Sequence, residues 1–514
     1  MTVLQAHALA LDSDEYDVCI VGGGAVGLAM ALWLGRQGHR IAVLESGDEV
    51  PDSERQELAS VVAGGLPLRQ DITSHPRRLG GATNEWGGRC IEHLPLDFED
   101  RPWVQHSHWP IQADKLTRHY RAAADLIGVA DLPAQTAADG TILESIQASD
   151  IEVESFRWSQ AVAFASDWRS IVDAMSNVDV VLGANVVGFE FAGQTVDRVE
   201  VIDRSDRRIA IAATTVVVAA GGIENVRLLA HVRDQGATLL GGPQLGQRVT
   251  EHPKTREGGM IIPTDRFPVA WFGRHVAGGG LIQHMLRMNS TRQRQSELLN
   301  HAIYLDPPIH DAWIRPGYVN AKRLRSEPVR TRQWWRSALV AARHSKELTK
   351  YALAKRRGEL GPVAQIIIVN QLEQPPDNGS SIRLGPDHDR YGVPIPVFDW
   401  RIGSQELESL VQFHHLLDQM LRDNDWGSLD SPFLNGDGHD VAWLNASHPM
   451  GGTRMSTSIN DGVVDPDLRV HATTNLFVAG VSVLPTGGYA NPTYTALALA
   501  HRLSERLEAM LPTR

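Results

Sequence analysis

A glycine-rich turn near the start of the chain limits the possible folds more than any other feature of the sequence. An apolar run at 17–21 is followed by Gly22, Gly24 and Gly27, and then by a run with helical character at 28–37. In the pattern G-x-G-x-x-G, the first glycine permits a tight turn, the second lets the backbone approach a pyrophosphate, and the third lets the helix pack on the strand. The segment therefore predicts the strand, turn and helix of a βαβ unit.

The acidic residue after the next strand extends this prediction. A second apolar run at 41–44 ends in Glu45, close to the spacing of about 20 residues at which such units place an acceptor for a ribose hydroxyl. The helix N-terminus would hold the phosphates, because its unpaired N–H groups and its dipole favour an anion. We interpret the segment as a dinucleotide-binding turn; a glycine-rich turn in an ordinary βαβ unit is the alternative.

The length and charge of the chain favour a two-domain enzyme that acts on small molecules. The 514 residues are enough for two or three lobes. A net charge of −12 disfavours general binding to nucleic acids. The two cysteines, Cys19 and Cys90, support neither a disulfide framework nor a cysteine zinc site, and we predict no metal site.

The N-terminal residues and the apolar runs bear on localisation. The first 14 residues lack the basic and apolar regions of an export signal. No apolar run reaches the roughly 20 residues that span a bilayer. We expect a soluble, cytoplasmic protein.

A second glycine-rich loop follows at 78–89. Gly80 and Gly81 precede Trp86, and Gly87 and Gly88 follow it. Glycine allows backbone to pass close to a ligand, so we predict that this loop lies against a flat group. A surface loop anchored by Trp86 is the alternative.

The middle of the chain changes to short strands. Residues 180–182, 188–191, 198–203 and 208–212 predict a small antiparallel sheet. The apolar run at 215–220 and the glycine turn after it then predict a second strand, turn and helix that rejoin the first sheet.

Residues 258–443 contain no nucleotide motif and are interpreted as a substrate-facing lobe. Strands are predicted at 366–369 and 381–384, and a helix at 404–422. The basic run 332–357 predicts one long helix, which could dock on a membrane, a partner or a second subunit. A solvated helix face is the alternative.

The C-terminal part holds the candidate catalytic residues. His448 precedes Gly451 and Gly452, and Asn491 precedes a proline that begins a closing helix predicted at 493–507. Short strands are predicted at 463–470 and 475–478. We interpret His252 as structural, because a histidine before a proline is held extended.

Together and in this order, these motifs resemble the glucose-methanol-choline (GMC) flavin oxidoreductase family over nearly the whole chain. The resemblance rests on 21–27 with Glu45, the 80–88 loop, 219–224, His448 and 490–493. It implies an α/β fold, with an FAD-binding Rossmann-type (glutathione-reductase-like) domain and an α+β substrate domain built on a β-sheet. The FAD-binding domain would comprise 14–95, 170–257 and 444–514. The substrate-binding domain and connecting segments would comprise 96–169 and 258–443.

The resemblance also implies which residues contact FAD. The N-terminal glycines and Glu45 would bind the ADP half, Val186 would lie near the adenine, and the 80–88 and 491–493 segments would lie near the isoalloxazine. The full set is Gly22, Gly24, Ala25, Val26, Gly27, Glu45, Ser46, Gly80, Gly81, Asn84, Trp86, Gly87, Gly88, Val186, Ala220, Gly221, Glu224, Gly480, Asn491, Pro492 and Thr493. Several relatives attach FAD to a histidine in the 80–88 loop; this chain has none there, so we predict non-covalent FAD.

The family's chemistry assigns roles to His448 and Asn491. A neutral imidazole can take the hydroxyl proton of an alcohol, and an amide can hold the substrate oxygen. Many members have a second histidine at the position of Asn491, and the His/Asn pair of this chain is similar to that of pyranose oxidases and cholesterol oxidases. Gly480, where choline- and glucose-oxidase-like members often have aspartate, is similar to pyranose-oxidase-like members. The resemblance implies oxidation of a secondary alcohol on a sugar or glycoside to a ketone, with O2, a quinone or a redox protein as electron acceptor.

Three alternatives stay open. The substrate could be a non-sugar alcohol, such as a sterol or a primary alcohol. The chain could be a hydroxynitrile-lyase-like enzyme with structural FAD. It could also be a binding flavoprotein that docks through 332–357, with a homo-oligomer or a membrane as the partner.

Overall fold

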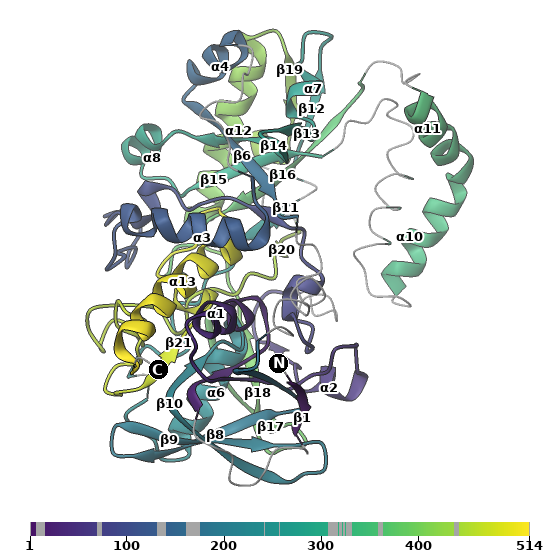
Figure 1. Ribbon diagram of the computed structural model, residues 1–514. Helices are drawn as coiled ribbons and strands as arrows, with labels where there is room; N and C mark the ends of the chain where they lie inside the picture. The colour runs from purple at the N-terminus through teal and green to yellow at the C-terminus, as the bar shows by residue number, and fades with distance from the viewer. Residues whose placement is uncertain are drawn as a thin grey trace.

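The computed structural model describes residues 2–6, 16–68, 75–130, 140–160, 175–240, 242–255, 258–306, 317, 321, 324, 332–357, 363–435 and 442–512. Within these ranges the chain forms two large β-sheets, a small third sheet and helices packed against them (Figure 1). The lower part of the view holds the sheet with the N-terminal strand, and the upper part holds the second sheet. The expected α/β class is confirmed.

The first sheet contains the predicted βαβ unit. Its eight strands follow the order β1-β7-β3-β2-β10-β9-β8, with β21 beside β10. Their bounds are β1 Thr2–Gln5, β2 Tyr16–Val21, β3 Ile41–Glu45, β7 Val178–Leu182, β8 Asn185–Ala192, β9 Thr195–Ile202, β10 Arg208–Val218 and β21 Leu476–Val478. β2 pairs in parallel with both β3 and β10, and every one of its residues is buried. A strand with two parallel neighbours and both faces covered is expected to be a nearly continuous apolar run, as 18–21 is.

Helices connect and cover this sheet. α1 (Ala25–Arg36) links β2 to β3, and α6 (Gly222–Asp234) follows β10. The closing helix α13 (Pro492–Met510) packs on α1 and on α3 (Thr117–Ile127). The predicted second strand, turn and helix are therefore confirmed, and they rejoin the first sheet through β10.

One strand prediction in this region is wrong. Residues 180–182 were expected in the small antiparallel sheet, but β7 lies in parallel register between β1 and β3. Only β8, β9 and β10 form the antiparallel part. An apolar run shows that a strand is buried but not which strand it pairs with, because the pairing is decided between segments distant in sequence.

The second sheet has ten strands. The order is β19-β12-β16-β15-β14-β6-β5, with β11, β13 and β20 paired at its sides. Their bounds are β5 Arg89–Cys90, β6 Ile151–Trp158, β11 Pro253–Thr255, β12 Met260–Pro263, β13 His275–Ala277, β14 Gly280–Met288, β15 His301–Leu305, β16 Ile366–Leu372, β19 Gly427–Asp430 and β20 Leu444–Asn445. The predicted helix at 404–422 is α12 (Ser404–Asp423), which packs on β19 and β15.

A third sheet joins segments from both parts of the chain. β17 (Ser381–His388) pairs with β18 (Pro394–Asp399), and β18 pairs with β4 (Val62–Ala63). β17 and β18 pack on α6. Four shorter α-helices of the described ranges are α2 Ser53–Glu57, α4 Gly140–Gln147, α7 Val269–Phe272 and α8 Ser290–Ser296.

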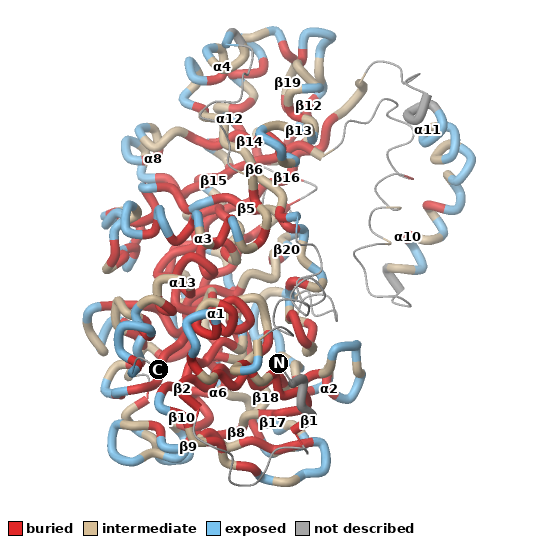
Figure 2. Tube along the Cα trace, viewed as in Figure 1, coloured by how far each residue is buried: buried red, intermediate tan, exposed pale blue. Residues whose placement is uncertain are grey.

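The basic run forms two helices, not the one that was predicted. α10 (Arg332–Arg343) ends before His344, and α11 (Ser345–Arg357) begins after it. Both helices stand at the side of the body, and much of their surface is exposed (Figure 2). The side chains of Arg332, Lys355, Arg356 and Arg357 lie outside the described part.

The strand predicted at 463–470 is absent from the described structure, where only isolated bridges occur, such as Val464 with Val470.

None of the helices in the described ranges has the length and apolar character that a bilayer crossing requires.

Candidate functional site

The turn between β2 and α1 is shaped by two glycines that leave no room for a side chain. Gly22 has a φ of +111°, and a Cβ there would lie 2.5 Å from the carbonyl oxygen of Ala219. A Cβ on Gly27 would lie 2.0 Å from the carbonyl oxygen of Gly22. Gly24 differs, because a Cβ there would meet nothing within 4 Å. The first and third glycines therefore close the turn, and the second leaves open space for a ligand.

Glu45, at the end of β3, is buried beside this turn. Its Oε2 accepts the Gly23 N–H at 2.9 Å, and its Oε1 accepts the Gly47 N–H at 2.7 Å. These contacts fix the carboxylate in place. Each oxygen retains a further acceptor position, so Glu45 can also accept from a hydroxyl group.

A pocket runs from this turn to the C-terminal histidine. The sequence-predicted residues that line it are Gly22, Gly24, Ala25, Val26, Glu45, Ser46, Gly81, Trp86, Val186, Ala220, Gly221, Glu224, His448, Gly480, Pro492 and Thr493. They come from both βα turns, the 80–88 loop, β8 and the start of α13. The tertiary structure therefore gathers segments that lie far apart in the sequence.

The other predicted residues lie outside the lining of this pocket. Among the described residues, Gly27, Gly80, Asn84, Gly87, Gly88 and Asn491 are not part of the lining. Gly80 donates its N–H to the Gly23 carbonyl, and the Asn84 amide donates to the carbonyls of Leu79 and Gly81. These contacts hold the 80–88 loop against the glycine turn.

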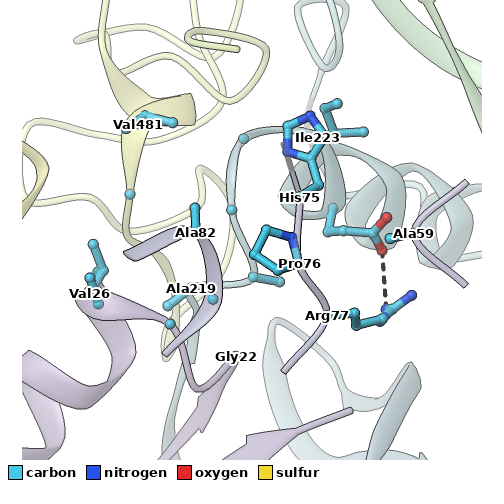
Figure 3. A pocket seen from close by; sticks show the side chains of 18 of the residues that line it. Gly22, Val26, Ala59, His75, Pro76, Arg77, Ala82, Ala219, Ile223 and Val481 are labelled. Atoms are coloured by element: carbon cyan, nitrogen blue, oxygen red, sulfur yellow. Dashed lines mark hydrogen bonds and ion pairs between the residues drawn. The ribbon is translucent and has the colours of Figure 1, made fainter. Parts of the chain in front are cut away.

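The pocket also contains residues that the sequence motifs did not indicate. His75, Pro76 and Arg77 form one segment of its wall, and Figure 3 shows them across from Val26 and Val481. No glycine pattern or periodicity distinguishes this segment, so only its place in the fold reveals it.

Arg77 connects two predicted residues. Its Nε donates to the Ser46 hydroxyl at 2.6 Å, and its guanidinium lies 3.4 Å from the Glu224 carboxylate, the ion pair marked in Figure 3. Burial alone would raise the pKa of Glu224, but the charges of Arg227 and Arg77 outweigh burial and lower that pKa. Glu224 therefore carries a negative charge that two guanidinium groups balance.

His448 lies at the other end of the pocket, on a loop held by a buried carboxylate. Its backbone N–H donates to both oxygens of Glu251, at 2.8 and 2.9 Å. The backbone N–H of His252 donates to the same carboxylate at 2.8 Å. Burial raises the pKa of Glu251 to about 7, although these N–H groups oppose the shift. Glu251 thus ties the His448 loop to the segment that enters β11.

The side chain of His448 contacts His252. The two Nδ1 atoms are 3.0 Å apart, and the rings are edge to face. His252 is fully buried, and its Nε2 lies 3.3 Å from the Gly487 carbonyl oxygen. Burial and the charge of Lys254 lower the pKa of His252 to about 3, and burial and the neighbouring His252 lower the pKa of His448 well below its usual value. Both rings are therefore neutral at neutral pH.

These partners determine where the hydrogens sit. A carbonyl oxygen only accepts, so His252 carries its hydrogen on Nε2 and its Nδ1 is an acceptor. His448 must then donate from Nδ1, which leaves a lone pair on its Nε2. Among the described residues, none hydrogen-bonds to that Nε2. The arrangement presents a neutral imidazole nitrogen that can accept a proton.

Asn491 is the N-terminal cap residue of α13, but its side chain does not cap the helix. Its Nδ2 donates to the Arg89 carbonyl at 3.2 Å, and its Oδ1 accepts from the Gln371 amide at 3.3 Å. One N–H and one acceptor position of the amide remain for another group.

Comparisons with known proteins bear on the family of the chain. Residues 17–348 match the family described as FAD dependent oxidoreductase, and residues 376–500 match the family described as GMC oxidoreductase. A 2-methyl-1,2-propanediol dehydrogenase of Mycolicibacterium austroafricanum is 20% identical, over 97% of this chain and 96% of that protein.

One further relative matches a short stretch of the sequence, and one solved structure matches nearly the whole fold. A C-glycoside 3-oxidase of Arthrobacter globiformis is 31% identical over 121 residues, which cover 23% of this chain and 22% of the relative. The crystal structure of a pyridoxine 4-oxidase from Mesorbium loti superposes with a TM-score of 0.59 at 16% identity, covering 96% of this chain and 99% of the other. That likeness concerns the fold.

Proposed function

The chain belongs to the FAD-dependent GMC oxidoreductases, which oxidise alcohols, and we propose that it oxidises a secondary alcohol of a sugar or glycoside to the ketone. The proposal assigns His448 as the base and Asn491 as the residue that holds the substrate oxygen. It rests above all on the neutral, unprotonated Nε2 of His448 in the pocket that the cofactor-binding residues line.

The residues of the pocket fit FAD. The α1 N-terminus has no side-chain cap, so its N–H groups are available to phosphate oxygens, and Gly24 leaves the space that a close phosphate needs. Glu45 supplies a fixed acceptor for a ribose hydroxyl. FAD, when bound, supplies the acceptor for the hydride of the alcohol carbon. We propose that it is held non-covalently; yellow colour that stays with the protein after acid precipitation would contradict this, and His75 would then be the first residue to test.

In the proposed reaction, the chain's own residues handle the proton and the position of the alcohol. His448 accepts the hydroxyl proton at Nε2 while Nδ1–H remains bonded to His252. Burial and the neighbouring His252 and Lys254 oppose the charge that develops on the ring. The imidazolium is therefore short-lived and returns its proton readily. The spare Asn491 N–H can donate to the substrate oxygen as it becomes a carbonyl.

Two observations support a glycoside as the substrate class. The matching stretch of the C-glycoside 3-oxidase has the highest identity of the relatives described above, although it covers less than a quarter of each chain. Asn491 stands where many family members carry a second histidine. The diol dehydrogenase relative makes a small non-sugar alcohol the second candidate.

An anaerobic screen of sugars, glycosides, sterols and simple alcohols tests this function. We expect a sugar or glycoside to bleach the flavin, and admission of air then shows whether O2 accepts the electrons. His448→Ala should retain FAD and slow bleaching by about 10²-fold or more, which is the usual contribution of a general base. His108→Ala, on an exposed histidine, is the matched control. Unchanged bleaching by His448→Ala would refute the assignment, and cyanohydrin cleavage without any bleaching would favour the lyase.

We further propose that α10 and α11 dock on an anionic membrane surface. Trp335, Leu339 and Leu353 are 55%, 70% and 48% exposed, beside the cationic residues of both helices. Within the described part of the chain, no residue forms an ion pair with Arg336, Arg343, Lys346 or Lys350. An apolar stripe between cations is typical of helices that lie in a lipid interface. Such docking would bring the flavin enzyme to a membrane quinone.

A further inference from the structure

A second cluster of chemically active side chains lies where α3 packs on α13, outside the pocket already described. His119 projects from α3, and His501 and Glu505 occupy successive turns of α13. His501 lies about 12 Å along the helix from Thr493 of the pocket, at a rise of about 1.5 Å per residue. The proposed oxidation uses none of these three residues.

The three side chains converge on one point. Their ligand atoms all lie within 4.8 Å of one another. The Nδ1 atoms of His119 and His501 are 2.8 Å apart, and His501 Nδ1 is 3.8 Å from Glu505 Oε1. Two Zn²⁺ ligands at about 2.0 Å from the metal are about 3.3 Å apart in a tetrahedron, so small rotations of the two rings would admit an ion.

Neighbouring residues fix the orientation of His501 and Glu505. The Trp33 ring packs edge to face on His501 with centroids 4.8 Å apart, which fixes that imidazole. Arg118 binds Glu505 Oε2, leaving Oε1 toward the histidines. His119 and Glu505 also line a surface hollow, from which water can reach a fourth position.

The charges around the cluster select the kind of ion. Neutral imidazoles are the form that binds metals. The close contact of the two Nδ1 atoms requires that one of them accepts, so at least one of the two rings is neutral. Arg502 and Arg506 are paired with Asp467, and Arg118 with Glu505. One partly neutralised carboxylate is too little for Ca²⁺ or Mg²⁺, whereas two imidazoles favour Zn²⁺.

We propose that His119, His501 and Glu505 bind one Zn²⁺-class cation that joins α3 to α13. The ion occupies a structural position, since it replaces the hydrogen bond between the two histidines with two metal–nitrogen bonds. It thereby stabilises the helix whose first turn forms part of the cofactor pocket.

Zn²⁺ titration of the chelator-treated, FAD-loaded protein tests the site. We expect one Zn²⁺ per chain with submillimolar affinity, a higher melting temperature with Zn²⁺, and tetrahedral absorption bands with Co²⁺. His119→Gln and Glu505→Gln should each weaken Zn²⁺ binding at least about tenfold. The exposed residues His108 and Glu508 give the matched controls His108→Gln and Glu508→Gln, which should bind as the parent does.

Retained flavin absorbance verifies that each variant is folded, and alcohol-dependent bleaching is measured separately. The proposal is overturned if the parent does not bind Zn²⁺ in this range. It is also overturned if both ligand variants bind as tightly as the controls. Neither result would bear on His448.

Discussion

At the residue scale, the histidine before Pro253 contacts the proposed base. Its position before proline suggested only a backbone role, which its buried contact with Gly487 partly fits. The structure adds that its Nδ1 lies 3.0 Å from His448. His252 thereby sets the tautomer of the proposed base, and no local pattern could indicate this, because the two residues are 196 positions apart.

Substitution of His252 tests this positioning role. His252→Leu removes the acceptor of the His448 Nδ1–H, and we expect flavin reduction by substrate to slow at least about tenfold, with a changed pH profile. His252→Gln keeps an acceptor and a donor and should restore part of the rate. Stopped-flow reduction across pH measures both. Equal rates in the two variants, with unaltered pH profiles, would show that His252 serves packing alone.

Buried histidines also predict how stability depends on pH. The pKa values of His252 and His301 are lowered by burial to about 3, and that of His93 to about 4. Below about pH 6.5 these histidines bind protons in the unfolded chain but stay neutral in the folded protein. The free energy of unfolding therefore falls as pH falls towards 4. Glu251 acts in the opposite direction between about pH 7 and 4.5, because its pKa is raised to about 7. Denaturant titrations at pH 7 and 5 should show lower stability at pH 5, and the difference should shrink in His252→Gln.

At the scale of an element, two glycines of the turn into α1 are predicted to have different roles, Gly27 in folding and Gly24 in cofactor binding. Gly27→Ala would place a Cβ 2.0 Å from the Gly22 carbonyl and should destabilise the protein by several kcal/mol. Gly24→Ala meets no atom within 4 Å and should fold normally, yet weaken FAD binding, because its methyl group faces the phosphate position. Melting temperature and FAD retention measure the two effects. Normal FAD affinity in Gly24→Ala would contradict the proposed phosphate position.

The boundaries of helices could be predicted where the hydrophobic periodicity was strong. The pairing of strands and the breaks within helices could not. The helix expected at 404–422 is α12, and the closing helix expected at 493–507 is α13. By contrast, β7 joined the parallel sheet, and the basic run divided at His344. Gly317, distant in sequence, lies so near His344 that a Cβ on it would be 2.5 Å from the histidine Cβ. Such a contact is not encoded in the helical period of 332–357.

At the scale of the whole molecule, α10 and α11 give an acidic protein a local cationic surface. We expect the FAD-loaded protein to sediment with anionic vesicles at low salt and to be released at high salt, since each cation near an anionic surface contributes about 1 kcal/mol. Arg336→Glu with Arg343→Glu should abolish binding, and Trp335→Ala should weaken it. Lys115→Glu, on another exposed cation, is the control. A salt-sensitive dimer without vesicle binding would identify a second copy as the partner instead.

The sequence by itself determined the glycine turn of the βαβ unit, the α/β class, the family and the candidate base, because each depends on residue types at short, fixed spacings. Only the tertiary structure decided that His252 orients His448, that 75–77 closes the pocket, and that His119 meets His501 and Glu505. Those contacts join residues that the packing of helices and sheets brings together. Sequence spacing carries no information about them, since a hydrogen bond or a ligand set depends on distance in space.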